Sequence, residues 1–368
     1  MSNVNVGKNK SKRIFYFDAL RALAIFAVII FHVGISCTKM VSFEYSIPTL
    51  KWLFNDFVVT FFRCGVDIFL MLSGALSLGR VWDIKTFLGK RIPRIVSPFL
   101  FWGFVLSLVL VVISLNFPNL IHTLDSYNLM GFLNYLYMTY MAKNYGFSPY
   151  WFFWMILGTY LIMPILNKWL LHSDLKEVEY FLVIWLITCL FDYTLFIPFP
   201  IKLSYFSGAI GMVVLGYYLR HTERKLLNNP YFAIVLLLIG SIGMMYISYL
   251  NSTVSSFYLF EIYNILMAIE VSGIFLLFKN FSKFNININF FNNENGIYHK
   301  SIFSLAKYSY GIYLVHRVII NLFYLIFKQV NSYKLMFIIL LVGSLFLSWG
   351  LLALLNRVPY INQVIGAK

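Results

Sequence analysis

The sequence has 368 residues, of which 60% are hydrophobic and only 12% are charged. An ordinary soluble domain is about 45–50% apolar and about 25% charged, so this composition excludes a typical water-soluble fold. The formal net charge of +15 would favour nucleic-acid binding if composition alone decided the matter. The basic residues lie in short segments between long apolar stretches, where orientation in a membrane explains them, and we expect no nucleic-acid partner.

Ten apolar stretches follow one another along the chain, each near the ~20 residues that cross a bilayer. The predicted spans are 14–36, 52–79, 95–116, 150–171, 178–199, 203–219, 230–250, 257–279, 302–327 and 334–355. The first is long enough to span and has no small-residue cleavage site after it, so we interpret it as a retained helix and not as a signal peptide. We predict an all-α, polytopic membrane protein of about ten transmembrane helices.

The predicted domain organisation is one membrane domain over residues 1–368. It consists of a basic tail (1–13), the transmembrane helices (14–355) and a second tail (356–368). The longest outward connection, roughly 117–149, contains a semi-apolar stretch from Leu129 to Met141. That stretch is too short and too polar to span, so we expect it to be re-entrant or to lie at the membrane interface.

The distribution of Lys and Arg predicts the orientation of the chain. Basic residues precede the first span and follow the second, sixth, eighth and tenth. Cytoplasmic loops are rich in Lys and Arg, so both termini are expected in the cytoplasm. The residues that carry this pattern are Lys8, Lys10, Lys12, Arg13, Arg80, Lys85, Lys90, Arg91, Arg94, Arg220, Arg224, Lys225, Lys279, Lys283, Lys300, Arg357 and Lys368.

Three charged or titratable residues lie in the first span, namely Asp18, Arg21 and His32. Such groups are costly inside a membrane and often mark functional sites. Arg21 and His32 are eleven residues apart, which returns to almost the same helix face about 16 Å further along the axis. The spacing therefore predicts one polar stripe across the membrane. The alternative is that Arg21 snorkels to the interface beside Asp18 while His32 caps the helix end.

The second span contains Arg63, Asp67 and Ser73 within FFRCGVDIFLMLSGAL. Arg63 and Asp67 have i, i+4 spacing, so we expect them to neutralise one another on one helix face. This pair could serve a site or could be an internal ion pair that joins two helices. Ser73 belongs to a small-residue patch with Gly74 and Ala75, which permits close helix approach.

A basic cluster stands at the inner end of the third span, in FLGKRIPRIVSPF. Lys90, Arg91 and Arg94 lie just before the membrane, and we expect Pro93 and Pro98 to interrupt the helix there. Several cations that converge beside a broken helix suit the phosphates of a nucleotide or a pyrophosphate. The alternative is that the cluster only fixes the orientation of the chain.

Other candidate residues lie later in the chain. His316 follows Tyr310 in the ninth span, and both are candidates for binding substrate or supporting the site. His316 could equally be a core histidine bonded to a backbone carbonyl or to a tyrosine. Trp151, at the outer start of the fourth span, could anchor the helix at the interface or offer a flat platform to a sugar ring. The three cysteines are far apart and show no paired ligand spacing, so we expect no metal site.

Five motifs together resemble a known family. They are FYFDALRALAIFAVIIFH with its Arg-x10-His spacing, GVDIFLMLSGAL, KRIPRIVSPFLFW, YWFFWMILGTYLIMPIL and YSYGIYLVH. In this order, over essentially the whole chain, they are similar to acyltransferase family 3, the membrane O-acyltransferases that modify bacterial surface glycans. The branch most similar includes the enterobacterial common antigen O-acetyltransferase and the intercellular-adhesin O-acyltransferase. Lys90 replaces the usual Arg of this family, and Ala19 replaces a frequent Gly.

The resemblance implies transfer of an acyl group, with acetyl as the first choice, from acyl-coenzyme A to a sugar hydroxyl. The implied acceptor is a cell-surface or lipid-linked polysaccharide, and the implied location is the inner membrane of a bacterium. His32 would be the general base. Arg21 with Lys90, Arg91 and Arg94 would hold the phosphates of acetyl-coenzyme A, and the donor chemistry requires no metal. The sequence sets no oligomeric state.

Two further interpretations stay open on the sequence alone. Histidine is also a competent nucleophile, so a covalent acyl-histidine intermediate is possible. In addition, charged residues inside a membrane mark transport pathways. The chain could therefore be a transporter or flippase of a polysaccharide or lipid-linked sugar, with Arg21, Arg63 and Asp67 along its path.

Overall fold

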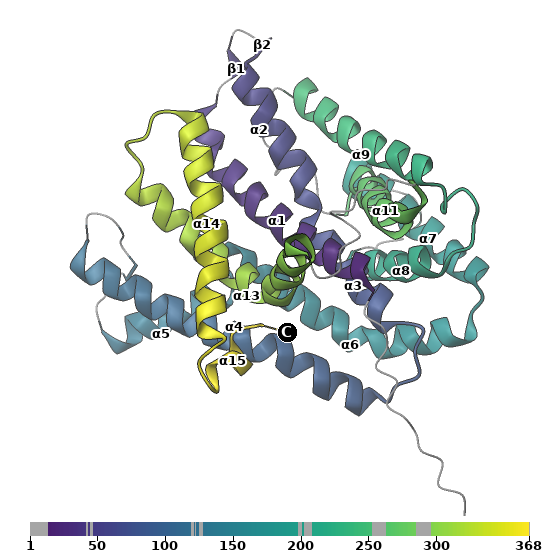
Figure 1. The fold of residues 1–368 in the computed structure, drawn as a ribbon, viewed down its shortest axis with the longest axis horizontal. Coiled ribbons are helices and arrows are strands. Elements are labelled where there is room, and N and C mark those ends of the chain that lie inside the picture. Colours follow the sequence, from purple (N-terminus) through teal and green to yellow (C-terminus); the bar gives the residue numbers. More distant parts are fainter. Residues whose placement is uncertain are drawn as a thin grey trace, which may run out of the picture.

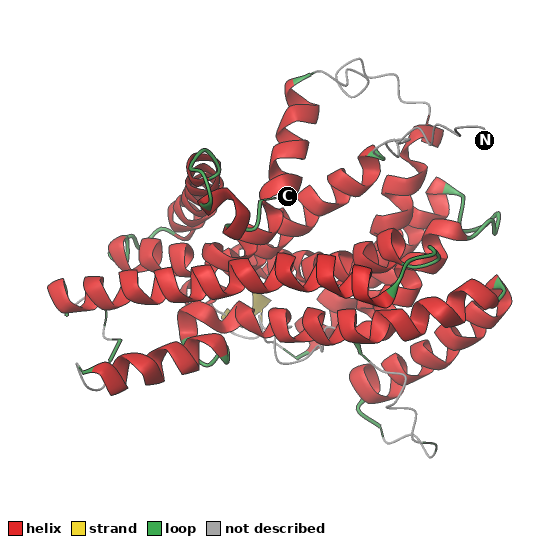
Figure 2. Cartoon of the chain, turned by 90° about the horizontal axis from the view of Figure 1, so that it is seen from below, coloured by secondary structure: helices red, strands yellow, loops and turns green. Residues whose placement is uncertain are grey.

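The structure is a computed structural model that describes residues 14–41, 43–44, 47–118, 121, 123–124, 128–197, 201, 208–251, 263–284 and 296–367. Helices account for almost all of this part of the chain, as Figure 2 shows. Within these ranges the only strands are β1 (Phe43–Glu44) and β2 (Ile47–Pro48), which form a small antiparallel pair. The predicted all-α class is confirmed. The predicted basic tail, residues 1–13, lies outside the described residues.

The helices follow the predicted spans closely. The long ones are α1 (Phe15–Cys37), α4 (Ile84–Asn116), α6 (Trp151–His172), α7 (Leu175–Leu190), α9 (Pro230–Leu250), α13 (Ile297–Ile326) and α14 (Tyr333–Leu355). Shorter ones are α2 (Leu50–Phe61), α3 (Gly65–Ser77), α5 (Leu129–Tyr140), α8 (Ala209–His221), α11 (Ile265–Asn280) and α15 (Ile361–Val364).

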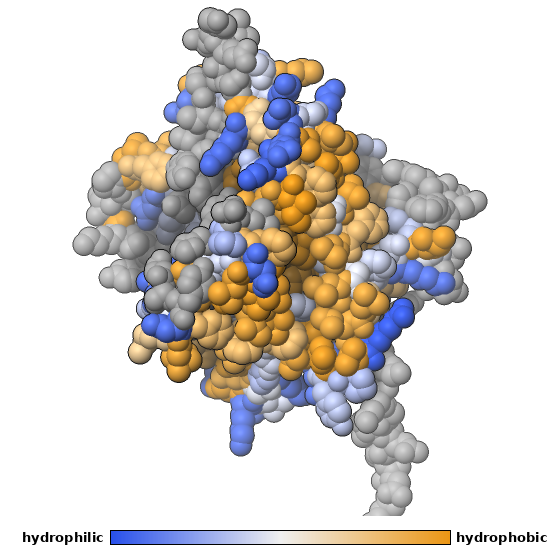
Figure 3. Space-filling view, turned by 90° about the vertical axis from the view of Figure 1, so that its left-hand side faces the viewer, coloured by the Kyte–Doolittle hydropathy of each residue, from blue (hydrophilic) through white to orange (hydrophobic). Residues whose placement is uncertain are grey.

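Eight described helical segments are long and apolar enough to cross a membrane. Helices α8 and α11 are shorter and overlap two further predicted spans, whose first residues lie outside the described ranges. A broad hydrophobic area covers the middle of the face drawn in Figure 3, and hydrophilic side chains gather mostly toward its edges. The chain is therefore a multi-pass membrane protein.

Helix α1 lies at the centre of the bundle (Figure 1) and contacts α2, α3, α11, α13 and α14. Most of its side chains are buried, from Phe17 through Cys37. A helix that is apolar on nearly every side belongs in an interior, where it has neighbours all around. The predicted polar stripe therefore lies inside the protein and not on its lipid-facing surface.

The second predicted span is broken and is not one helix. Helix α2 ends at Phe61, a 3-10 turn covers Phe62–Cys64, and α3 begins at Gly65. A Cβ atom at Gly65 would lie 2.7 Å from the backbone oxygen of Ala24 in α1. Only a glycine permits so close an approach of two helix backbones. The break thus stands where the chain crosses the central helix.

Helix α4 is longer than predicted and is not interrupted by its prolines. It begins at Ile84 and runs for 33 residues through Pro93 and Pro98. A proline removes one backbone hydrogen bond and crowds the carbonyl group four residues before it. For Pro93 that carbonyl belongs to Gly89, which is exposed and has no atom near its missing side chain. The carbonyl has room to tilt outward, so the helix continues.

The semi-apolar stretch of the long connection forms α5, a helix of 12 residues. At 1.5 Å per residue it is about 18 Å long, too short to span the membrane. Its apolar residues Leu129, Met130, Leu133 and Tyr137 are exposed. These features agree with the predicted re-entrant or interfacial segment.

The segment after α14 folds back into the bundle and does not extend freely from it. The Trp102 indole N–H in α4 donates a hydrogen bond to the carbonyl oxygen of Ile365 at 3.1 Å. The Ile365 side chain is fully buried. Gly366 lies against Gly311 of α13, where a side chain would not fit. Residues 361–367 are therefore an integral part of the helical core.

Candidate active site

His32 lies near the end of α1, and its ring is fixed by its own helix. Its Nδ1 atom is 2.8 Å from the carbonyl oxygen of Val28. A carbonyl oxygen can only accept, so Nδ1 carries the hydrogen and Nε2 keeps its lone pair. The side chain is half-buried. This arrangement gives His32 a nitrogen that can take a proton or attack a carbonyl carbon.

His316 from α13 faces His32, although the two residues are far apart in the sequence. Their ring centroids are 5.0 Å apart and the rings meet at 71°. The Nδ1 atom of His316 donates to the carbonyl oxygen of Tyr313 at 2.6 Å. Its Nε2 atom is buried and has no hydrogen-bond partner among the described residues. The structure thus brings together two imidazoles that the sequence treats separately.

Arg317, which the sequence analysis does not single out, fastens α13 to α1 at this place. It is almost fully buried, and its Nη1 atom donates to the backbone oxygen of His32 at 3.2 Å and to Ser36 Oγ at 3.0 Å. The Ser36 hydroxyl also donates to the His32 oxygen, at 3.0 Å. An Arg inside an apolar span, directly after His316, is the signal that could have found it.

A second group of residues lies toward the start of α1, around a pocket of about 320 Å³. We call it the basic pocket, because Arg21, Arg91, Arg94 and Lys307 all line it. Its walls come from α1, α3, α4, α6, α13 and the segment after α14. The predicted convergence of Arg21 with Arg91 and Arg94 is therefore present, and Lys307 is a further cation that the sequence analysis did not include.

Neighbouring groups hold the arginines of the basic pocket. Arg21 Nη1 lies 3.2 Å from a carboxylate oxygen of Asp18, which is buried. Arg91 Nη2 donates to Ser77 Oγ at 2.9 Å. Because these partners fix the guanidinium groups in advance, little side-chain entropy is left to lose when an anion binds.

Two other predicted residues also line the basic pocket. Tyr310 donates its hydroxyl hydrogen to the carbonyl oxygen of Ile95 at 2.8 Å, and Ser73 donates to that of Phe69 at 3.0 Å. Both hydroxyls are thus bonded to the backbone of the pocket walls. These hydrogen bonds stabilise the walls of the pocket, and that of Tyr310 connects α13 to α4.

Lys90 does not take part in the basic pocket, contrary to the prediction. Its side chain is exposed, and it is not among the residues that line the pocket. Lys90 is rotated by about 100° from Arg91 around the helix axis. It also lies one turn closer to the start of α4 than Arg94 does.

Arg63 and Asp67 interact through their charges and not through a hydrogen bond. Both carboxylate oxygens of Asp67 are buried, and neither has a hydrogen-bond partner in the described part of the chain. Arg63 lies in the 3-10 turn Phe62–Cys64, between α2 and α3. Its guanidinium is also 5.8 Å from the centre of the Phe31 ring.

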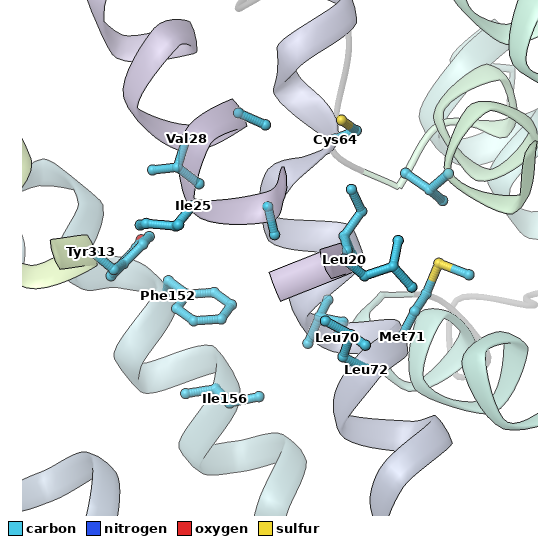
Figure 4. Close-up of a cluster of buried hydrophobic side chains, with 14 of the residues drawn as sticks. Leu20, Ile25, Val28, Cys64, Leu70, Met71, Leu72, Phe152, Ile156 and Tyr313 are labelled. Carbon is cyan, nitrogen blue, oxygen red and sulfur yellow. The ribbon is translucent and has the colours of Figure 1, made fainter. Parts of the chain in front are cut away.

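Aromatic side chains stand between the basic pocket and the two histidines. Tyr313 from α13 and Phe152 from α6 line the pocket and meet beside Ile25 of α1 (Figure 4). Their ring centroids are 5.0 Å apart, and the Tyr313 ring is 5.6 Å from that of His316. The Tyr313 hydroxyl donates to the carbonyl oxygen of Pro149 at 2.5 Å. Trp151, beside Phe152 in the sequence, is 40% exposed and does not line this pocket.

The arrangement as a whole can bind an anion at one place and move a proton, or form a covalent bond, at another. No significant match was found among curated proteins or among solved structures. The family model described as an acyltransferase domain matches residues 14–353. That match contains both histidines, Arg317 and every cation of the basic pocket. The chain therefore belongs to acyltransferase family 3, in agreement with the resemblance of its motifs.

Proposed function

We propose that this acyltransferase moves an acyl group, in the first place acetyl, from acyl-coenzyme A to a hydroxyl of a cell-surface or lipid-linked polysaccharide sugar. The observation that carries the proposal is the placement of two kinds of functional group at different positions along α1. Three arginines converge near its start, and a histidine with a free lone pair stands about 16 Å further along the axis. The location proposed with it is the inner membrane of a bacterium, and the proposed branch is the one named above from the motifs.

The donor would bind with its phosphates in the basic pocket. Guanidinium groups form charge-assisted, often paired hydrogen bonds with phosphate oxygens, and Arg21, Arg91 and Arg94 all face the same space. The pantetheine arm of coenzyme A is extended and its length is of the order of the rise between Arg21 and His32. The arm would pass Tyr313 and Phe152, so these two aromatic side chains would part to admit the thioester.

The chemical step requires only His32 and the two residues beside it, His316 and Arg317. His32 Nε2 takes the proton of the sugar hydroxyl as the sugar oxygen bonds to the thioester carbonyl carbon. The carbon–sulfur bond then breaks, and the departing thiolate receives the proton from the His32 imidazolium. Every proton is returned, so the products are an O-acyl sugar and free coenzyme A. In the alternative mechanism with a covalent intermediate, the acyl group would first be transferred to His32 Nε2 and then to the acceptor hydroxyl.

His316 and Arg317 would support this step from α13. The ring of His316 lies against that of His32, and its buried Nε2 atom can accept a hydrogen bond from a substrate hydroxyl. Arg317 holds the backbone of His32 in place through its hydrogen bond to the His32 carbonyl oxygen. Both roles are consistent with an acyl transfer.

The test is the release of free thiol from acetyl-coenzyme A by purified protein in nanodiscs. We expect release that depends on an acceptor glycan and is lost in His32→Ala, with unchanged thermal unfolding. A transporter or flippase would release no thiol with any glycan, so that result would contradict the proposal. Release by His32→Ala at the wild-type rate would keep acyl transfer but remove His32 from it.

A further inference from the structure

Two adjoining hollows lie at the end of α1 opposite the basic pocket. The first, of about 500 Å³, is lined by residues from α1, α4, α5 and α13, among them Ser36 and Asn321. The second, of about 400 Å³, runs beside α5 and is lined by Asn134. Thr123, Tyr135 and Asn144 line both. The two hollows adjoin at these shared walls, and we call them together the distal groove.

The distal groove begins next to the reacting centre. Ser36, in the first hollow, donates to the backbone oxygen of His32 and accepts from Arg317. A ligand that touches Ser36 is therefore one hydrogen bond away from the turn of α1 that carries the base. The second hollow leads from there along α5, away from His32.

The lining of the groove offers groups that recognise hydroxyls. The Thr123 hydroxyl oxygen is buried and has no partner among the described residues. Asn144 donates its amide hydrogens to the oxygens of Tyr135 and Thr139, so its amide oxygen is the group it can offer to a ligand. Tyr135 adds a flat ring of the kind that packs against a sugar face. Amide, hydroxyl and aromatic groups together suit a glycan.

The size of the groove indicates how much of a glycan it takes. Each hollow alone falls within the range of roughly 300–1,000 Å³ that is typical of pockets for small molecules. A single sugar ring over Ser36 would leave the hollow around Asn134 unused. We propose that the distal groove binds an acceptor of at least two linked sugars, with the ring to be acylated over Ser36 and the rest of the chain along α5. This inference rests on the proposed function.

The experiment compares acceptors of different length. The probe is the surface glycan of the strain that carries this chain, stripped of its acyl groups, partially hydrolysed and separated by size. Thiol release from acetyl-coenzyme A gives the Michaelis constant for each fraction. We expect this constant to fall from one sugar to two or more, because the longer chain also fills the second hollow.

Matched asparagine variants locate the effect. Asn321→Leu should raise the Michaelis constant for every fraction about three- to tenfold, the usual effect of one lost hydrogen bond. Asn134→Leu should raise it for the longer fractions only. Asn251→Leu, at the exposed end of α9, should change nothing. An unchanged Michaelis constant for acetyl-coenzyme A and unchanged thermal unfolding show that each variant is folded.

The outcomes separate the two proposals. Equal use of single sugars and longer chains, with no effect of Asn134→Leu, would overturn the extended acceptor while acyl transfer stands. An equal effect of Asn251→Leu would overturn the location of the groove. No thiol release with any fraction would contradict the proposed function itself, and the acceptor site would fall with it.

Discussion

His32 is fixed by hydrogen bonds to its ring and by hydrogen bonds to its backbone oxygen. Its ring bonds to Val28 within α1, whereas its backbone oxygen accepts from Arg317 and Ser36. The first contact decides which ring nitrogen keeps the lone pair, and the second fixes where the helix turn lies. Arg317 therefore acts through His32 and is a positioning residue.

Replacing Arg317 tests this role. Arg317→Met removes the hydrogen bonds to the His32 backbone oxygen and to Ser36 Oγ. We expect the displaced base to lower kcat ten- to a hundredfold, which is a loss of about 1.4–2.8 kcal/mol in the transition state. The Michaelis constant for the donor should stay near the wild-type value, because the basic pocket is untouched. Arg317→Lys should recover part of kcat. The measurement is steady-state thiol release. An equal loss in both variants, together with a lower unfolding temperature, would indicate a purely structural residue.

The basic pocket provides a matched pair of charge reversals. Arg91 lines the pocket and Lys90 beside it is exposed and does not. Arg91→Glu should raise the Michaelis constant for acetyl-coenzyme A ten- to a hundredfold, whereas Lys90→Glu, with the same change of charge, should leave it within about twofold. Varying donor and acceptor separately in nanodiscs measures both. If both variants raised the Michaelis constant for acetyl-coenzyme A equally, donor binding would depend on the overall charge at this side of the membrane and not on the basic pocket.

Sequence reasoning found some of these residues and missed others for a physical reason. Arg21, Arg91 and Arg94 could be grouped because helix periodicity and membrane depth are local properties. Whether Lys90 faces the pocket depends on the rotation of α4, which its neighbours fix. The form of the interaction between Arg63 and Asp67 could not be predicted, because the break in the helix between them depends on contact with α1. Tyr313 gave no signal, since an aromatic residue in a span is ordinary.

At the scale of elements, α3 and α8 are one of the closely packed helix pairs in the described part of the chain. Gly74 of α3 lies against the backbone of Val213, and Gly216 of α8 lies against that of Met71, so a side chain at either glycine would meet main-chain atoms. Helix pairs in membranes associate through such small residues, because close backbones maximise van der Waals contact. The small-residue patch around Ser73 thus has a structural role beside the basic pocket.

Enlarging Gly74 should separate these helices. Gly74→Val places a branched side chain against the backbone of α8, and overpacking of this kind costs about 1–3 kcal/mol or more. We expect a clearly lower unfolding temperature in detergent and weaker donor binding, since Ser73 lines the pocket. The control is Gly158→Ala in α6, where no atom lies near the missing side chain. A wild-type unfolding temperature for Gly74→Val would show that the contact can relax.

The boundaries of elements were less predictable than their number and order. Hydrophobic length locates a span. Each of the ten predicted stretches contains a helix, or two helices in the case of the second stretch, and the short α5 follows from the same criterion. The start of α4 could not be found this way, because its first turns are polar and carry the basic cluster. The break between α2 and α3 has a glycine as its only sequence mark, and glycines are frequent in membrane helices.

For the whole molecule, the basic pocket and the distal groove lie at opposite ends of α1. The Lys and Arg pattern assigns the basic pocket to the cytoplasm, where coenzyme A is made, and the groove to the outside. The bilayer would thus separate the two substrates, and the histidines would stand where their reacting ends meet. This arrangement requires one orientation of the chain and fails in the other.

Cysteine labelling tests the orientation. Lys51 and Lys85 are both exposed, at the start of α2 and in the first turn of α4. In a background without the three buried native cysteines, Lys51→Cys should react with a membrane-impermeant maleimide added to intact cells. Lys85→Cys should react only after the cells are opened. The reverse pattern would place His32 at the cytoplasmic side and exclude an external acceptor.

The segment at residues 361–367 has a consequence for how the protein is made. Gly366 forms part of the wall of the basic pocket, and Ile365 is buried beside α4. Residues 361–367 follow α14 in the sequence, so the ribosome makes them after the last of the long helices. A nascent chain that has not reached them contains all the arginines of the basic pocket but lacks one of its walls. We therefore expect a chain truncated before residue 361 to insert in the membrane without becoming active.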